Sequence, residues 1–436
     1  MKKIKHLMIW IGLLLSLVSC KDTMEAIGLG GDEIPAEGLV LTLQLTNFNK
    51  QQIGTRAESS EAFNSLCAVF YGDNNKYLGK ADCFSTLSPP QSDGSYKVKI
   101  TNVPAGTKNV HLVANASDMK ESEAQDLQSL TAAKERDPKL DAPICWGKIS
   151  IDKLLEANPS VPMLRQCAKI SLEIDKGIQG DFTNAGLYVY NMANKAAIAP
   201  TNYIEPTTDD LAESTDLKDN PLGDGTATTV AVNETSADKA MVIIKAKYKK
   251  SEEEDYREGY YKVALYKDAN KTTQYALLRN HHYTIKVIKV NDYGFSTLDE
   301  AKKSLPENRL EVEVRDDNPE ITRMIACKDY ELGVSDYQEV NANTTEATVT
   351  IVTTLPKATS SDDKLYGVKI NNSWIACQHE TENDILETSR SSKGKKYTLK
   401  LTLQKNNQSE TPRTGTITVT SGDLSLDITI KQTGFD

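Results

Sequence analysis

The stretch that decides the fold is residues 38–56, GLVLTLQLTNFNKQQIGTR. Every second residue at its start is a leucine: Leu39, Leu41, Leu43 and Leu45. Because successive side chains of a strand point to opposite faces, this period of two predicts a half-buried β-strand. A polar tether follows and ends at Arg56-Ala57, a bond that a trypsin-like protease would cut. The strand is therefore either the ordinary first strand of a sandwich or a removable strand whose loss opens a groove.

The N-terminus predicts export to a membrane. A lysine-rich start precedes an apolar run over residues 7–18, which is too short for a spanning helix. The run ends at Ser19-Cys20, and a small residue before a cysteine at this position resembles the lipobox of bacterial lipoproteins. The resemblance implies that a signal peptide, residues 1–19, is removed and that acylated Cys20 anchors the chain in the outer membrane through a linker, residues 20–37. A plain signal peptide with an incidental cysteine is the alternative.

The charge of the chain argues against nucleic acid as a partner. The chain has 51 basic and 61 acidic residues and a formal net charge of −10. Loss of residues 1–19 removes three lysines and no acidic residue, which leaves 48 basic residues and a net charge of about −13. A protein this acidic is repelled by the phosphates of nucleic acids and by anionic lipid headgroups.

The sequence carries no motif that predicts catalysis or a cofactor. The adjacent His281 and His282 lie in a strand-like run, so they point to opposite faces and do not readily share one metal ion. Six cysteines follow Cys20 without the spacing of a metal site, and their pairing is open. Nucleophile-elbow, zinc-protease, P-loop and dinucleotide-binding motifs are absent. We therefore predict no enzyme, no metal and no cofactor, although a pair of carboxylates brought together by folding, as in glycosidases, cannot be seen in a sequence.

Short alternating runs separated by turns predict an all-β protein. Two helices are predicted, a long one over residues 117–136 and a short one that opens with a capping box between Thr297 and Glu300. A composition break at residues 316–319 precedes a C-terminal part made of short strands and turns. We divide the chain after its linker into three sandwiches, at residues 38–160, 161–318 and 319–436.

Several stretches, in this order, resemble the fimbrillin superfamily of Bacteroidetes, which builds type V pili. The first two are the lipobox at Cys20 and the strand that leads to Arg56-Ala57. The others are VPAGTKNVHLVAN at 103–115, LRQCAKISLEI at 164–174, LRNHHYTIKV at 278–287 and GFSTLDEA at 294–301. Together they extend over residues 39–315.

The resemblance implies two consecutive transthyretin-like β-sandwiches without catalytic activity. It also implies an assembly route, in which the lipoprotein reaches the outer membrane and an arginine-specific protease cuts between Arg56 and Ala57. The first strand then leaves, and a strand from another fimbrial subunit fills the groove by β-augmentation. In this mode of binding, main-chain hydrogen bonds supply affinity and alternating side chains fill pockets.

The C-terminal stretch RTGTITVTSGDLSLDITIKQTG, residues 413–434, resembles the BACON modules of Bacteroidetes. The residues in the matching places are Arg413, Gly415, Gln432 and Gly434. The resemblance implies an Ig-like sandwich with a suspected role in carbohydrate binding, which needs exposed aromatic rings. Trp374 and Tyr366 are the candidate glycan contacts, although the strand-like run around Trp374 is more typical of a core position.

Two functions fit these observations. We expect the final strand, residues 424–430, to complete its own sandwich, so the chain can accept a strand but cannot donate one. This favours a tip or accessory subunit that contributes to adhesion, with other fimbrial subunits and a host or bacterial surface glycan or protein as partners. The alternative is a monomeric cell-surface lipoprotein that binds glycans through its C-terminal module and is never cut at Arg56.

Overall fold

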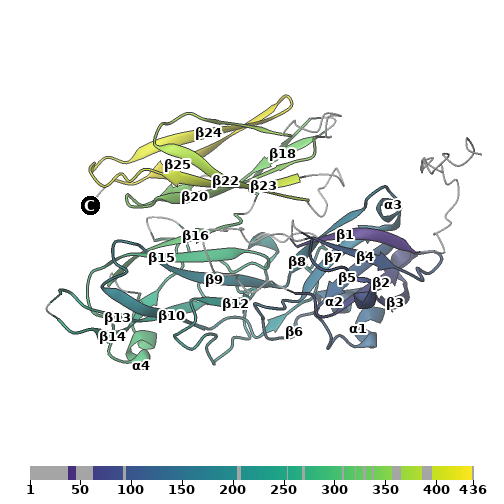
Figure 1. Cartoon of the computed structure of the whole chain (residues 1–436), viewed down its shortest axis with the longest axis horizontal. Helices are drawn as coiled ribbons and strands as arrows, with labels where there is room; N and C mark the ends of the chain where they lie inside the picture. Colours follow the sequence, from purple (N-terminus) through teal and green to yellow (C-terminus); the bar gives the residue numbers. More distant parts are fainter. Residues whose placement is uncertain are drawn as a thin grey trace, which may run out of the picture.

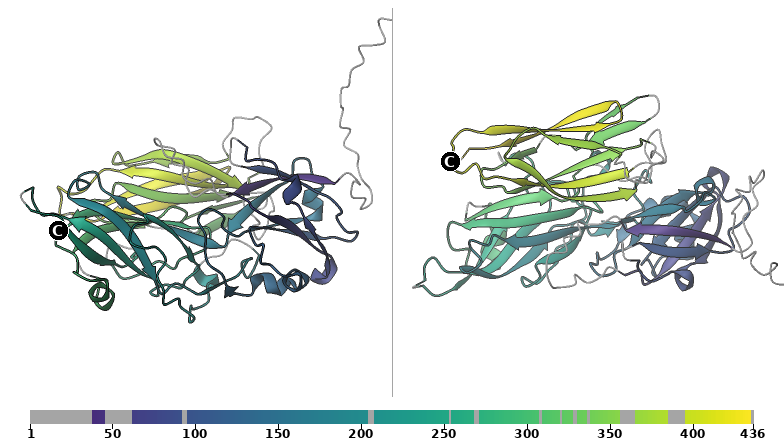
Figure 2. Two further views of the ribbon diagram at one scale, coloured as in Figure 1. Left: turned by 60° about the horizontal axis from the view of Figure 1, so that its bottom comes forward. Right: turned by 45° about the horizontal axis from the view of Figure 1, so that its top comes forward.

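The chain folds into three β-sandwiches, which we call domains 1, 2 and 3, and the predicted all-β class is confirmed. Domain 1 lies beside domain 2, and domain 3 is stacked on domain 2 (Figures 1 and 2). In the described part of the chain, no helix is long and apolar enough to cross a membrane. The computed structural model describes residues 38–45, 62–91, 95–203, 208–252, 254–267, 271–306, 309–319, 321–327, 330–335, 338–355, 365–384 and 395–434.

Domain 1 is one seven-stranded sheet, in the order β3-β2-β5-β7-β8-β1-β4, that curls around its core. Strands β7 and β8 pair over only two residues, which lets the two halves of the sheet face each other. The leucines of β1 pack against apolar residues of β2, β4 and β5 in this core. The bounds are β1 (Leu39–Leu45), β2 (Leu66–Tyr71), β3 (Tyr77–Asp82), β4 (Tyr96–Ile100), β5 (Asn109–Ala114), β7 (Cys145–Ser150) and β8 (Ser160–Arg165).

The long helix predicted over residues 117–136 is wrong. This part forms two single-turn helices, α1 (Glu121–Gln125) and α2 (Leu127–Thr131), followed by the short strand β6 (Lys134–Glu135). The cause is Asp126, whose extended backbone ends α1 and whose side chain accepts a hydrogen bond from the Gln128 N–H to start α2. Leu127 and Leu130 nevertheless face inward, as the apolar spacing predicts.

The border between domains 1 and 2 lies at Gln166, so the predicted border at residue 161 is wrong. Residues 161–174 contribute to two strands, since β8 completes domain 1 and β9 (Cys167–Ile174) starts domain 2. Val161 and Met163 are fully buried in the core of domain 1 and pair with β1. Both halves of this run are apolar and no turn residue divides them, so the pattern does not reveal the border.

Domain 2 packs a four-stranded sheet, in the order β12-β9-β15-β16, against a three-stranded sheet, β10-β13-β14. Helix α4 (Leu298–Lys303) begins with the predicted capping box between Thr297 and Glu300. The remaining bounds are β10 (Phe182–Tyr190), β12 (Thr229–Asn233), β13 (Met241–Tyr248), β14 (Arg257–Val263), β15 (His282–Val290) and β16 (Leu310–Asp316).

The joint between domains 1 and 2 is apolar and continuous. Ile198, Ala199 and Tyr203 of domain 2 pack with Trp146 of domain 1 in one hydrophobic cluster. Strand β11 (Lys195–Ala196) pairs with β6, and the Tyr203 hydroxyl donates a 3.0 Å hydrogen bond to the Leu127 carbonyl. A shared core together with backbone pairing holds these two domains as one unit.

Domain 3 is the separate C-terminal sandwich predicted beyond the break at residues 316–319, and it has its own core. Its sheets have the orders β17-β18-β20-β23-β22 and β19-β25-β24-β21. The bounds are β17 (Arg323–Ala326), β18 (Glu331–Val334), β19 (Gln338–Val340), β20 (Glu346–Thr353), β21 (Gly367–Ile370), β22 (Ile375–Asp384), β23 (Lys395–Leu403), β24 (Arg413–Ser421) and β25 (Leu424–Gln432).

Candidate functional site

Strand β1 is an inner strand of domain 1. It pairs antiparallel with β4, where Leu41 faces Val98, and parallel with β8, where Leu43 faces Val161. Leu41 and Leu43 are at most 1% exposed and Leu39 is 8% exposed, whereas Val40 on the opposite face is 56% exposed. The predicted half-buried strand is therefore confirmed, and Leu45 is partly buried against the same core.

Strand β1 is separated along the chain from every strand that follows it. The described chain stops at Leu45 and resumes at Ala62, before every other strand. A cut after Arg56 would therefore leave all the other strands of the described chain on one polypeptide. Cys20, Arg56 and Ala57 lie outside the described residues, so their predicted roles stay predictions.

Removal of β1 would expose two kinds of surface. The edges of β4 and β8 would lose the ladders that now run from residue 39 to residue 45. The apolar core that now contacts the three buried leucines would meet water. Unpaired strand edges and exposed apolar surface both favour capture of another strand. Such a groove would select a strand with apolar side chains at every second position.

Strand β25, by contrast, is fully used inside domain 3. It pairs antiparallel with β24 along its whole length and parallel with β19 at its end. Gln432 is fully buried, donates to the carbonyls of Ala342 and Thr344, and accepts from the Arg413 guanidinium at 2.7 Å. The prediction that the last strand completes its own sandwich is confirmed.

The two candidate glycan contacts are buried. Trp374 is 8% exposed and lies in the core of domain 3, with the Arg413 guanidinium 4.3 Å from its ring centre. Tyr366 is 5% exposed and packs on Tyr397 with ring centres 4.3 Å apart. Neither ring presents a face to a glycan, so assigning these two residues to glycan contact was wrong. The predicted core position of Trp374 is confirmed, although Trp374 lies in the turn before β22 and not in a strand.

The paired histidines contact two different carboxylates. His281 Nδ1 lies 2.8 Å from Asp316 Oδ2, and His282 Nδ1 lies 3.0 Å from Asp317 Oδ2. In the searched ranges of the chain, no three histidine, cysteine or acidic side chains are placed to hold one metal ion.

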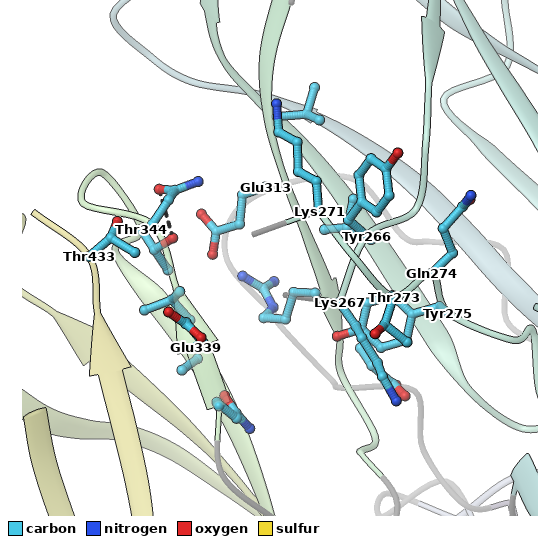
Figure 3. Close-up of a pocket in the computed structure, with 18 of the residues that line it drawn as sticks. Tyr266, Lys267, Lys271, Thr273, Gln274, Tyr275, Glu313, Glu339, Thr344 and Thr433 are labelled. Carbon is cyan, nitrogen blue, oxygen red and sulfur yellow. Dashed lines mark hydrogen bonds between the residues drawn. The ribbon is translucent and has the colours of Figure 1, made fainter. Parts of the chain in front are cut away.

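A cleft of about 1230 Å³ opens between domains 2 and 3 (Figure 3). Tyr266, Gln274 and Glu313 come from the wall formed by domain 2, and Glu339 and Thr344 come from the wall formed by domain 3. Most of the lining is hydroxyl, amide or charged, with acidic and basic groups on both walls. Charges of both signs on both walls argue against a polymer of a single charge as the ligand. The residues that line this cleft come from distant segments without a shared motif, so the cleft could not be predicted from the sequence.

Glu313 is the carboxylate with the most altered titration in this cleft. It lies on β16, opposite Lys286 on β15, and points away from the core of domain 2. Burial raises the pKa of Glu313 to about 7, against the opposing effects of Arg315 and Lys286. At neutral pH the group is therefore partly protonated and can both donate and accept a hydrogen bond.

Residues 367–433 match the BACON family model, described as "Putative binding domain, N-terminal". The match confirms the resemblance of the C-terminal stretch to BACON modules, and it lies entirely within domain 3. A search of curated protein sequences gave no significant match to the chain.

Solved structures that are similar to part of the chain include three from Bacteroides and Parabacteroides species. A "putative cell adhesion protein" from Bacteroides eggerthii is 14% identical over 66% of this chain and 97% of its own, with a TM-score of 0.39. A "putative cell adhesion protein" from Parabacteroides distasonis is 12% identical over 64% of this chain and 96% of its own, also with a TM-score of 0.39. A "putative adhesin" from Bacteroides ovatus is 11% identical over 59% and 91%, with a TM-score of 0.27.

Proposed function

We propose that this chain is a non-catalytic subunit of a type V pilus, in a tip or accessory position, that contributes to adhesion. It is exported as a lipoprotein acylated at Cys20 and carried to the cell surface on the outer membrane. An arginine-specific protease then cuts after Arg56, and the chain accepts a strand from another fimbrial subunit in place of β1.

The inner position of β1 is the observation that carries this proposal. A strand bound on both edges whose leucines fill the core can leave only if another strand replaces it. The bond after Arg56 is placed to release β1 without cutting the rest of the described fold. The complete pairing of β25 supports a terminal position, because a strand that is fully paired inside its own domain is not available to a neighbouring subunit.

Arg56→Ala tests the proposal. We expect a folded, lipidated protein that remains monomeric and is absent from sheared fibres, whereas the parent chain enters them with Ala57 at its N-terminus. Lys50→Ala, in the same tether, is the matched control because an arginine-specific protease does not need it. Mass spectrometry of the mature N-terminus and blotting of fibres give the readout. Normal fibre entry by Arg56→Ala would contradict strand replacement in this protein.

The BACON match to residues 367–433 favours a second candidate, a monomeric surface lipoprotein that binds glycans through domain 3. In that case β1 stays in place and Arg56 is not cut. The two candidates differ in the N-terminus of the surface-exposed form. Lipid-bearing Cys20 as the only N-terminus on cells would favour the second candidate over fibre assembly.

A further inference from the structure

The joint between domains 2 and 3 differs in kind from the apolar joint between domains 1 and 2. In the parts of the chain that are described, no hydrophobic cluster contains residues of both domain 2 and domain 3. The outer faces of two sheets meet here instead. We call them the domain 2 face, which comprises Thr284, Lys286, Glu311, Glu313 and Arg315, and the domain 3 face, which comprises Glu346, Thr348, Thr350, Thr398 and Lys400.

Alternation along the strands makes both faces polar. On β16 the residues between those of the domain 2 face, Val312 and Val314, pack into the core of domain 2. On β20 the residues between those of the domain 3 face, Val349 and Ile351, are fully buried in the core of domain 3. The polar sides of two sandwiches therefore face each other, where stable sheet packing normally places apolar residues.

Glu346 is the centre of the contacts across this joint. Its Oε2 atom lies 2.5 Å from Arg315 Nη1 of domain 2 and 2.9 Å from Lys400 Nζ of domain 3. Lys286 Nζ of domain 2 donates to the Thr345 hydroxyl at 3.3 Å, and Asn343 Nδ2 of domain 3 donates to Glu311 Oε1 at 2.9 Å. Hydrogen bonds and ion pairs of this kind exchange readily for bonds to water, so the joint has little net preference for closure.

The domain 3 face also buries two threonine hydroxyls, which lowers the stability of the docked form. Thr348 and Thr350 are at most 1% exposed, and their Oγ1 atoms have no hydrogen-bond partner among the described residues. A buried hydroxyl without a partner costs about 1–3 kcal/mol compared with the same group in water. A surface that is always covered would be more stable with valine at these positions. Threonine suits a surface that water reaches part of the time.

We propose that domain 3 is a hinged module that docks reversibly on domain 2, and that the ion pair of Glu346 with Arg315 stabilises the docked form. A single chain crossing near Pro319 joins the two domains, so domain 3 can turn away without breaking any other covalent link. Opening separates the two walls of the interdomain cleft and admits ligands too large to enter the docked form. Docking restores the ion pair between Glu346 of domain 3 and Arg315 of domain 2. The proposal is independent of strand replacement at β1.

Lysine labelling of the intact protein, read by mass spectrometry, tests the proposal. The reporter is Lys286 on β15, which is partly buried and donates to the Thr345 hydroxyl of domain 3. Glu346→Gln removes the charge that pairs with Arg315, and we expect Lys286 to react at least about tenfold faster. Glu339→Gln is the matched control, because Glu339 lines the same cleft but pairs with Lys431 inside domain 3 at 2.9 Å.

A second variant should slow the labelling instead of accelerating it, and its result does not depend on whether Glu346→Gln folds. The double variant Thr348→Val, Thr350→Val removes the two unpartnered hydroxyls, so we expect slower labelling of Lys286 than in the parent chain. Unchanged labelling in a folded Glu346→Gln protein would overturn the proposal, and so would unchanged labelling in the valine variant. Equal acceleration by Glu339→Gln would also overturn it, because it would show a loosening of domain 3 itself.

Discussion

Replacement of Leu43 by alanine measures how firmly β1 is held. Leu43 is fully buried in the core of domain 1, between β4 and β8. A fully buried Leu→Ala change costs about 2–5 kcal/mol, because it removes transfer free energy and leaves a cavity. Val40 is on the same strand but is 56% exposed, so Val40→Ala should change the free energy of unfolding by about 0.5 kcal/mol or less. We therefore expect a difference of about 3 kcal/mol between the two variants.

The assay is urea unfolding of the uncut chain, followed by tryptophan fluorescence. A loss of about 3 kcal/mol corresponds to more than a hundredfold change in an equilibrium constant. In protein cut after Arg56, the β1 segment carrying Leu43→Ala should accordingly be displaced by a competing strand peptide at a concentration more than about a hundredfold lower than for the parent. Equal unfolding free energies for Leu43→Ala and Val40→Ala would refute the view that the leucines of β1 hold the groove.

Two further changes test other parts of the structure. Gly415→Ala should destabilise domain 3 by about 1–3 kcal/mol in urea unfolding, because the added Cβ would lie 2.7 Å from the Trp374 ring. Gly180→Ala, which meets nothing within 4 Å, is its control, and equal losses would contradict a packing cause. Glu313→Gln should stabilise the chain by about 1 kcal/mol at pH 8 but not at pH 5. Burial raises the pKa of Glu313 to about 7, so the folded state loses stability as the pH rises towards that value and the carboxyl group ionises. Glutamine cannot ionise and avoids this loss. A gain that is equal at both pH values would show that ionisation of Glu313 is not involved.

The tail illustrates how a sequence motif and its structural cause relate. The resemblance to BACON modules is carried by Arg413, Gly415 and Gln432, and the structure shows them in contact with Trp374 or with one another. Arg413 lies over the indole ring of Trp374, and the side-chain amide of Gln432 donates hydrogen bonds to the backbone carbonyls of Ala342 and Thr344. These residues maintain the core of domain 3, so their presence in the sequence identifies a fold and does not identify a ligand.

The pattern of residues along one segment predicts which face of a strand is buried, but it does not predict which strands become its neighbours. The leucine alternation predicted the buried face of β1, because the period of a strand is set by its own residues. The same pattern could not show that β1 is an inner strand, since pairing with β4 and β8 depends on residues 53 or more positions away. The helix predicted over residues 117–136 failed for a related reason, because one local hydrogen bond at Asp126 outweighed the wider apolar spacing.

The sequence by itself determined the all-β class, the half-buried first strand, the BACON-like tail and the place of the Arg56-Ala57 bond behind that first strand. These features depend on side-chain period, turn residues and short motifs, which are properties of contiguous segments. Only the tertiary structure decided that domains 1 and 2 share an apolar joint and that domain 3 meets domain 2 through a polar one. The physical reason is that a polar strand face looks the same in a sequence whether water or another sheet covers it, and only the packing of the domains decides which.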